Sequence, residues 1–296
     1  MPDRVNVAGN AIYSPGGEQV PLADHALDNG SFLAMLACNY FDLTDDVAFF
    51  SQIEPALYRG LDHIRRDDSG LVYTPSEKSQ CPYGFTDTIA KSGHLLFCSL
   101  LYYHACRRME RACLAVNNSH VDAYRRSADL IAGHLDLLWN EDEGMFWAAD
   151  QDCRQIDIWG SALAVHLGCV SDSQSAKVSA WLVEHYAGIV QHGQVRHLPA
   201  GQTWQRFFKE KGVETGTYQN GAFWATPLAW VVPTIARCDR ELAVATIAAA
   251  IANFRECGIA ECVNGDYRKV PNFVVSATSV YSLLRADEPG QWTCSS

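Results

Sequence analysis

The chain alternates two kinds of predicted helix, and this alternation constrains its fold more than any other sequence feature. One kind is amphipathic, with apolar residues recurring every three or four positions on one face. The amphipathic segments are 47–64, 119–139, 173–190 and 239–256. The other kind is apolar on nearly all sides and comprises 30–41, 88–106, 158–170, 221–236 and 273–284. A helix without a polar face must be surrounded by protein.

The order of these segments predicts an all-α fold: an (α/α) toroid with apolar inner and amphipathic outer helices. Connections from outer to inner helices are long and rich in Gly, Asp and aromatic residues, whereas the reverse connections are short. In such a repeat, the long connections lie together on one face, above the N-termini of the inner helices. We expect residues 22–296 to form one toroid domain and residues 1–21 an N-terminal arm.

Polar residues stand at the entrances of the apolar helices and are candidate functional residues. They are Asp28, Asp87, Asp157, Gln219 and Asn272. The long connections add aromatic residues, namely Tyr83, Phe85, Trp147, Trp159, Trp204, Tyr218 and Trp224. Aromatic rings stack on the C–H faces of sugars, and carboxylates bind hydroxyl groups. The sequence therefore predicts a carbohydrate-binding pocket.

Composition excludes several classes of function. A net charge of -11, from 23 basic and 34 acidic residues, argues against a nucleic-acid partner. No segment reaches the ~20 apolar residues of a membrane span, and the N-terminus lacks a signal-peptide core. The 11 cysteines contain no C-x-x-C pair and fit a reducing compartment, so we expect a cytoplasmic protein without membrane association. Because nucleotide, zinc-protease and serine-hydrolase motifs are absent, we expect no cofactor and no metal site.

Five stretches resemble segments of one known family. They are "DNGSFLAMLACNYFDLTDDVAFF", "YGFTDTIAKSG", "LWNEDEGMF", "GTYQNGAFWATPLAWV" and "ECVNGDYRKVPNFVVSATSVYSLL". The chain thus resembles the six-hairpin (α/α)6 glycosidases over roughly residues 22–285. Within that family it is most similar to the inverting α-glucosidases: trehalase, processing α-glucosidase and the glucosidase part of debranching enzymes.

This resemblance implies roles for individual residues. Asp87 would be the general acid and Glu261 the general base in the inverting hydrolysis of a small α-linked glycoside. Tyr218, Gln219, Asn220 and Trp224 would bind sugar. Together with the pocket residues, the expected substrate-binding set is Asp28, Tyr83, Phe85, Asp157, Trp159, Trp204, Tyr218, Gln219, Asn220 and Trp224.

The chain also departs from the family pattern. Thr86 stands between Gly84-Phe85 and Asp87, and "YQNG" lacks the aspartate of the corresponding trehalase segment. A complete six-hairpin barrel has two helices in each hairpin. The sequence predicts only nine helices, and the missing helices would precede residue 22. Three alternatives follow: an open barrel, a barrel completed by another subunit in a homo-oligomer, or a fold used for another purpose.

An inverting glycosidase requires a protonated and an ionised carboxyl group about 6.5–9.5 Å apart. At a helix N-terminus, Asp87 would be stabilised as an anion by the helix dipole, and further by Lys91 one turn later. A general acid needs the opposite effect, from burial beside Tyr83 and Phe85 or from a second carboxylate. Glu261, expected in a loop, would ionise easily, as a base should.

Each candidate also has a structural interpretation. Asp87, Asp28 and Asp157 could be helix N-caps, and Glu261 could be a solvated loop carboxylate. The acidic run at Asp42, Asp45 and Asp46 fits a cap and the first turn of the next helix better than a cation site. The loop containing Val195–His197 and Arg206 is either solvated or reaches the pocket.

Three functions remain open from the sequence. The first is the glycosidase described above. The second is a toroid enzyme of biosynthetic metabolism that performs an acid-catalysed isomerisation or cyclisation. The third is a non-catalytic carbohydrate-binding protein.

Overall fold

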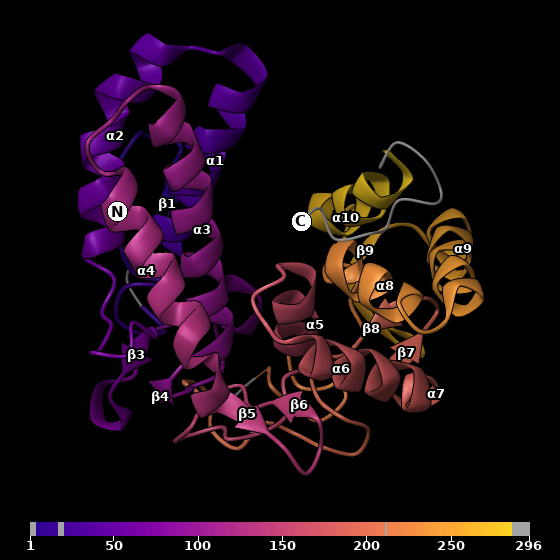
Figure 1. The fold of residues 1–296 in the computed structure, drawn as a ribbon. Coiled ribbons are helices and arrows are strands. Elements are labelled where there is room, and N and C mark those ends of the chain that lie inside the picture. The colour runs from indigo at the N-terminus through magenta and orange to yellow at the C-terminus, as the bar shows by residue number, and fades with distance from the viewer. Residues whose placement is uncertain (1–3, 17–20, 211, 286–296) are drawn as a thin grey trace. The chain divides into compact units, whose positions relative to one another are not determined.

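The computed structural model describes residues 4–16, 21–210 and 212–285, and these form two compact units (Figure 1). Unit 1 consists of Met1–Leu138 with Ala148–Arg154, and unit 2 of Trp139–Trp147 with Gln155–Ser296. Because the chain divides into two units, the expectation that residues 22–296 form one toroid domain remains a prediction. The N-terminal arm falls partly on residues 1–3 and 17–20, which lie outside the described residues; its described part contains β1 (Arg4–Val5) and β2 (Ala11–Ile12), which pair antiparallel.

Unit 1 is built on four helices. They are α1 (Asn29–Thr44), α2 (Val47–Asp62), α3 (Leu96–Ala115) and α4 (Val121–His134). Helix α1 packs against α2 and α3, and α3 packs against α4 (Figure 1). Between α2 and α3 lie β3 (Tyr73–Thr74), the 3₁₀ turns η1 (Ser76–Lys78) and η2 (Gly84–Thr86), and β4 (Gly93–His94); the 3₁₀ turn η3 (Leu135–Leu138) follows α4.

Local chemistry explains the α1–α2 hairpin. Asp45 ends α1 in a left-handed conformation, with φ 53°, and the Asp46 carboxylate accepts a hydrogen bond from Phe49 N at 2.9 Å, which caps α2. The capping interpretation of the acidic run is confirmed for Asp46, whereas Asp42 lies within α1 and Asp45 ends it. A Cβ on Gly30 would lie 3.0 Å from Gly60 O, so glycine permits the close approach of the two helices.

The described residues of unit 2 form six helices, and α8 packs against four of the others. The six are α5 (Ile158–His166), α6 (Asp172–Glu184), α7 (Tyr186–Ile189), α8 (Leu228–Ala236), α9 (Arg240–Cys257) and α10 (Val274–Arg285). Helix α8 packs against α5, α6, α9 and α10. Every residue of α5 from Ile158 to Val165 is buried, as an apolar helix requires.

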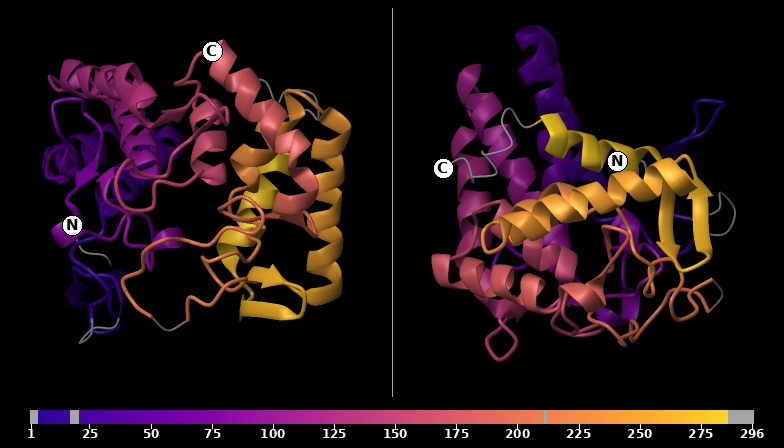
Figure 2. Two further views of the ribbon diagram at one scale, coloured as in Figure 1. Left: turned by 90° about the horizontal axis from the view of Figure 1, so that it is seen from below. Right: turned by 90° about the vertical axis from the view of Figure 1, so that its right-hand side faces the viewer.

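Short strands of unit 2 join into one strip. The strip contains β7 (Val190–Gln191), β8 (Gln194–Val195), β9 (Ala260–Asn264) and β10 (Tyr267–Pro271). A separate hairpin consists of β5 (Trp139–Asn140) and β6 (Met145–Phe146). Val195 bridges to Trp224, and Phe223 bridges to Val263, so residues 223–224 link β8 to β9. Figure 2 shows the β9–β10 hairpin at the end of α9.

The mainly helical class is confirmed, but two predicted helix starts are wrong. Helix α3 begins at Leu96 rather than 88, because Gly93 has φ 84° and residues 92–95 pair with residues 149–152. Helix α8 begins at Leu228 rather than 221, after Gly221 with φ 117° and directly after Pro227. Closure of a toroid stays a prediction.

Burial on all sides, expected for the apolar helices, is wrong for α1 and α10. Helix α1 exposes Phe32, Leu33, Leu36, Tyr40 and Leu43. Helix α10 exposes Val274, Val275, Tyr281 and Leu284.

Candidate active site

Asp87 follows a 3₁₀ turn and does not begin a helix. It ends η2 with a helical backbone, φ -64° and ψ -20°, and its side chain is half-buried. Because α3 begins only at Leu96, the capping interpretation of Asp87 and the argument from the helix dipole are both wrong. Its role as general acid stays a prediction.

Asp28 fixes the turn that precedes Asp87. It stands directly before α1, but its side chain makes no capping hydrogen bond. Instead, Oδ2 accepts a hydrogen bond from Gly84 N, the first residue of η2, at 2.8 Å. Asp28 and Asp87, which are distant in sequence, therefore lie at the same turn of unit 1, and Asp28 is buried there.

The two aromatic candidates of this turn pack against the core of unit 1. The Tyr83 ring stacks on Phe97 at 4.1 Å between centroids and lies 5.3 Å from the Phe85 ring. Tyr83 is 4% exposed, whereas Phe85 is half-buried. Phe85 is therefore more accessible to a ligand than Tyr83.

Lys91 is a buried cation next to the same turn. It is 2% exposed, and its Nζ donates to Thr86 Oγ1 at 3.3 Å. The sequence placed Lys91 one helical turn after Asp87, but the intervening chain is not helical.

Glu261 lies in strand β9, not in a loop, and it is 8% exposed. Its Oε2 lies 4.0 Å from Lys269 Nζ on the paired strand β10. The interpretation as a solvated loop carboxylate is therefore wrong. The nearby ammonium stabilises an ionised carboxylate at a position that burial alone would disfavour. Its role as general base stays a prediction.

Aromatic candidates of unit 2 form a connected cluster near this hairpin. The Lys269 Nζ lies over the Tyr218 ring, 2.7 Å from its centroid, and Tyr218 lies 5.3 Å from Trp224. Trp224 in turn lies edge-on to Trp159 at 5.9 Å. Tyr218 has φ 38°, a backbone conformation that is costly outside glycine and that persists most often at functional sites.

His197 belongs to this cluster. The sequence had left open whether its loop is solvated or reaches the pocket. Its ring stacks on Trp159 at 3.6 Å, and the residue is 2% exposed. The solvated alternative is therefore wrong for His197. Lys269 was not predicted, and strand alternation would not have found it, because Lys269 is opposite Cys262 rather than Glu261.

Several other candidates hold the long loop of unit 2 together. Asn220 Oδ1 accepts from Trp204 N at 3.0 Å, and Asn220 Nδ2 donates to Val213 O at 2.7 Å. Trp204 Nε1 donates to Gln219 O at 2.9 Å. These bonds give the three candidates structural roles, and their sugar-binding roles stay predictions.

Asp157 is the N-cap of α5, as its structural interpretation proposed. Its Oδ1 accepts from Gly160 N at 2.8 Å, and it is 2% exposed. A capping carboxylate of this kind stabilises the first turn of the helix. A second role in substrate binding stays a prediction.

Two of the buried polar atoms of unit 2 that lack a hydrogen-bond partner within the described residues concern the candidate site. They are Trp159 Nε1 and Thr226 Oγ1, whose residues are 0% and 3% exposed. Such atoms are uncommon in native proteins, and a water or a ligand hydroxyl often satisfies them. Trp159 therefore offers a donor from within the aromatic cluster.

A cavity of about 380 Å³ lies in unit 1 at the N-terminus of α1. It is lined by Tyr13, His25, Asn29, His63 and Gln80, together with smaller residues. None of the predicted site residues lines it. Among residues 4–16, 21–210 and 212–285, no group of three or more His, Cys, Asp or Glu could hold a metal ion.

The described helices include none that is both long and apolar enough to cross a membrane. No protein-family profile matches the chain, and no curated protein matches it.

Solved structures do resemble the chain. A GH63 mannosylglycerate hydrolase from Thermus thermophilus, in complex with glucose, is similar with a TM-score of 0.65 and 14% identity, over 95% of this chain and 83% of the other. An uncharacterized conserved protein from the same organism is similar with a TM-score of 0.60 and 12% identity, over 86% of this chain and 76% of the other.

A rhamnosidase from Klebsiella oxytoca with rhamnose bound is also similar. The TM-score is 0.61 at 15% identity, and the match covers 89% of this chain but only 48% of the rhamnosidase. At these identities the likeness concerns the fold. The chain therefore shares its fold with structures that include glycoside hydrolases.

Proposed function

We propose that this protein is a glycosidase that hydrolyses a small α-linked glycoside with inversion. Asp87 is the general acid and Glu261 the general base. The observation that carries the proposal is the position of Glu261: a buried carboxylate held beside an ammonium group, in the hairpin next to Tyr218 and Trp224. The fold shared with glycoside hydrolases supports it.

The proposed roles follow from the chemistry of inversion. The base removes a proton from water as that water attacks the anomeric carbon, and the acid protonates the departing oxygen. The Lys269 ammonium favours the ionised form that a base needs. Tyr218, Trp224 and the Trp159 indole N–H bind the sugar ring and a hydroxyl group, and Phe85 covers the turn that carries Asp87.

The test compares Asp87→Asn and Glu261→Gln with matched controls. Asp68→Asn is the control in unit 1, and Asp266→Asn is the control in the same hairpin as Glu261, since both control residues are exposed. With a panel of α-linked disaccharides and aryl α-glycosides, both active-site variants lose at least ~10³-fold in kcat while the controls keep their activity. Proton NMR of the first product detects the inverted anomer.

A sugar-binding protein without catalysis is the second candidate function. It is favoured by the aromatic cluster of Trp159, Tyr218 and Trp224, since stacking on a sugar ring does not require a catalytic carboxylate. Under this alternative, calorimetry detects a bound mono- or disaccharide, and prolonged incubation with wild-type protein releases no product. Turnover of a non-sugar substrate would instead support the biosynthetic alternative.

A further inference from the structure

Residues 148–154, here called the strap, are held in unit 1 by paired contacts with residues 92–95. Leu96 N donates to Ala148 O at 3.1 Å, and Leu95 bridges to Ala149. Ser92 N donates to Asp152 O at 3.3 Å, and Gln151 N donates to Ser92 O at 3.2 Å. The strap therefore lies alongside residues 92–95, and the one bridge, between Leu95 and Ala149, is antiparallel.

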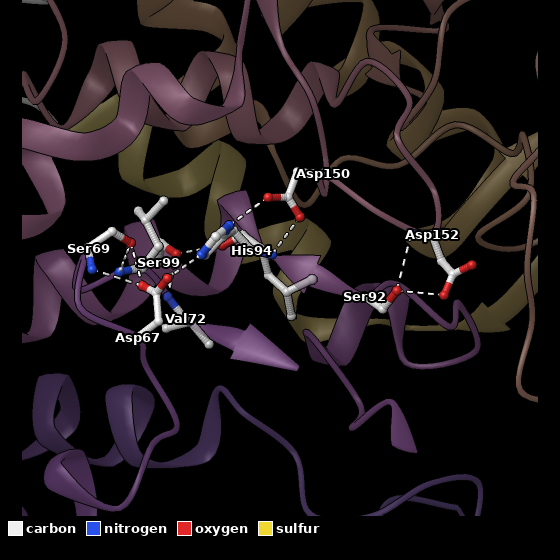
Figure 3. Close-up of polar contacts among 10 residues, drawn as sticks. Asp67, Ser69, Val72, Ser92, His94, Ser99, Asp150 and Asp152 are labelled. Carbon is white, nitrogen blue, oxygen red and sulfur yellow. Dashed lines mark hydrogen bonds and ion pairs between the residues drawn. The ribbon is translucent and has the colours of Figure 1, made fainter. Parts of the chain in front are cut away.

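Side chains reinforce this pairing at two points, which Figure 3 shows. Ser92 Oγ donates to Asp152 Oδ2 at 2.5 Å, and Asp152 N donates to Ser92 Oγ at 3.1 Å. At the other point, His94 lies between Asp150 of the strap and Asp67 of the turn before β3 (Figure 3).

The geometry around His94 requires a specific protonation state. Nδ1 lies 2.6 Å from Asp150 Oδ2, and Nε2 lies 2.7 Å from Asp67 Oδ2. Carboxylates only accept hydrogen bonds, whereas a neutral imidazole has one donor and one acceptor. Only the imidazolium form donates to both carboxylates at once, so loss of a proton leaves one short contact without its hydrogen.

The electrostatic surroundings agree with this requirement. Burial opposes protonation of His94, but hydrogen bonds and charges from Asp67 and Asp150 outweigh it and raise its pKa above the ordinary 6.5. Burial likewise opposes ionisation of Asp67, while hydrogen bonds from Ser69 and His94 lower its pKa below 3.8. Tyr73 of β3 also faces His94, 5.5 Å away between ring centroids, and the Arg65 guanidinium lies over the Tyr73 ring.

We propose that His94 is a proton-operated latch, which holds the strap on unit 1 while its imidazole is charged and weakens that hold when the imidazole loses its proton. The strap reaches the proposed catalytic segment as well, because Cys153 Sγ lies 4.0 Å from Ala90 O, three residues after Asp87. The latch itself does not depend on the proposed glycosidase activity.

The sign of the pH dependence follows from linkage. A group with a raised pKa in the folded state stabilises that state fully below its unfolded pKa, and the contribution is lost as pH rises through the raised pKa. The latch is therefore closed at pH 5–6 and weakens as pH rises above 6.5. Each pH unit between the two pKa values changes the closing equilibrium about ten-fold.

The test measures hydrogen exchange in strap peptides of the full-length chain from pH 5 to 9, corrected for intrinsic exchange. In wild type, protection of residues 148–154 is progressively lost as pH rises and His94 loses its proton. His94→Gln removes this step and leaves low, pH-independent protection. His134→Gln, which changes an exposed histidine of α4, keeps the wild-type step.

Two further outcomes decide the assignment. The NMR titration midpoint of His94 lies above 6.5 in wild type and falls in Asp150→Asn, even if the glutamine variant is poorly folded. A protection step that persists in His94→Gln assigns the titration to another group, such as Tyr73, and overturns the latch. A wild-type strap whose protection is constant from pH 5 to 9 overturns it equally.

Discussion

Lys269 Nζ lies 4.0 Å from Glu261 Oε2 across the two strands of the β9–β10 hairpin. The two residues are not directly paired, since Lys269 is opposite Cys262. The lysine thus reaches diagonally to the carboxylate, while its ammonium also covers the Tyr218 ring. One cation therefore contacts both the proposed base and a proposed sugar-binding ring.

We expect Lys269→Met to lower kcat/KM by roughly ten-fold or more, because the base loses the cation that stabilises its ionised form. The acidic limb of the rate profile moves to higher pH for the same reason. Steady-state rates on the preferred α-glycoside from pH 4 to 9 measure both effects.

Lys269→Arg is the matched variant, since it keeps the charge but changes its geometry. It should retain the wild-type acidic limb even if kcat falls. An unchanged acidic limb in Lys269→Met would show that the ammonium does not act on the proposed base.

The segment 88–95 shows where sequence patterns stop predicting local structure. Its apolar residues continue those of α3, so periodicity extends the helix back to 88. Gly93 breaks the helix, because its φ of 84° and its contact with Asp150 belong to the pairing with the strap. That pairing joins residues 92–95 to residues 149–152, and no local pattern encodes so distant a partner.

Gly93→Ala should destabilise unit 1 by about 2–3 kcal/mol, because a Cβ there overlaps Asp150 Oδ1 in a strained backbone. Gln151 Cγ lies 2.8 Å from the same position, and moving Asp150 aside would break its bonds to His94 N and Nδ1. Urea unfolding followed by circular dichroism measures the change.

Gly133→Ala is the matched control, since nothing lies within 4 Å of its Cβ in α4. It should stabilise the protein by about 0.5–1 kcal/mol through helix propensity. Equal effects of the two substitutions would contradict the docking of the strap described here.

The candidate site was predictable in its residue types but not in its contacts. Asp28 stood out as a polar residue before an apolar helix, yet its bond to Gly84 depends on a turn that only the fold creates. Capping by Asp157 was one of two alternatives offered by the sequence, and it was predictable because a cap is a local interaction. Glu261 was expected in a loop, since the five-residue strands of its hairpin are short and contain charged residues.

The His94 latch also predicts a pH dependence of stability. The free energy of unfolding of wild type minus that of His94→Gln is largest below pH 6.5 and decreases as pH rises through the raised His94 pKa. On the acid side, the difference decreases again below pH 3.8 as Asp67 becomes protonated through its lowered pKa. Urea titrations at a series of pH values measure the difference, and a value that grows with pH above 6.5 would contradict the latch.

Glu54 of α2 is 0% exposed and accepts hydrogen bonds from four residues at or near the α3–α4 connection. The donors are Tyr124 Oη at 2.8 Å, His120 Nδ1 at 2.9 Å, Asn118 Nδ2 at 3.2 Å and Cys113 Sγ at 3.9 Å. Glu54→Gln should cost about 1–3 kcal/mol, because the amide nitrogen faces a donor where the carboxylate accepted. Glu77→Gln, at an exposed carboxylate of η1, serves as control and should change stability by less than about 0.5 kcal/mol. Urea unfolding measures both, and similar stabilities of the two variants would show that the buried carboxylate does not hold α2 to this connection.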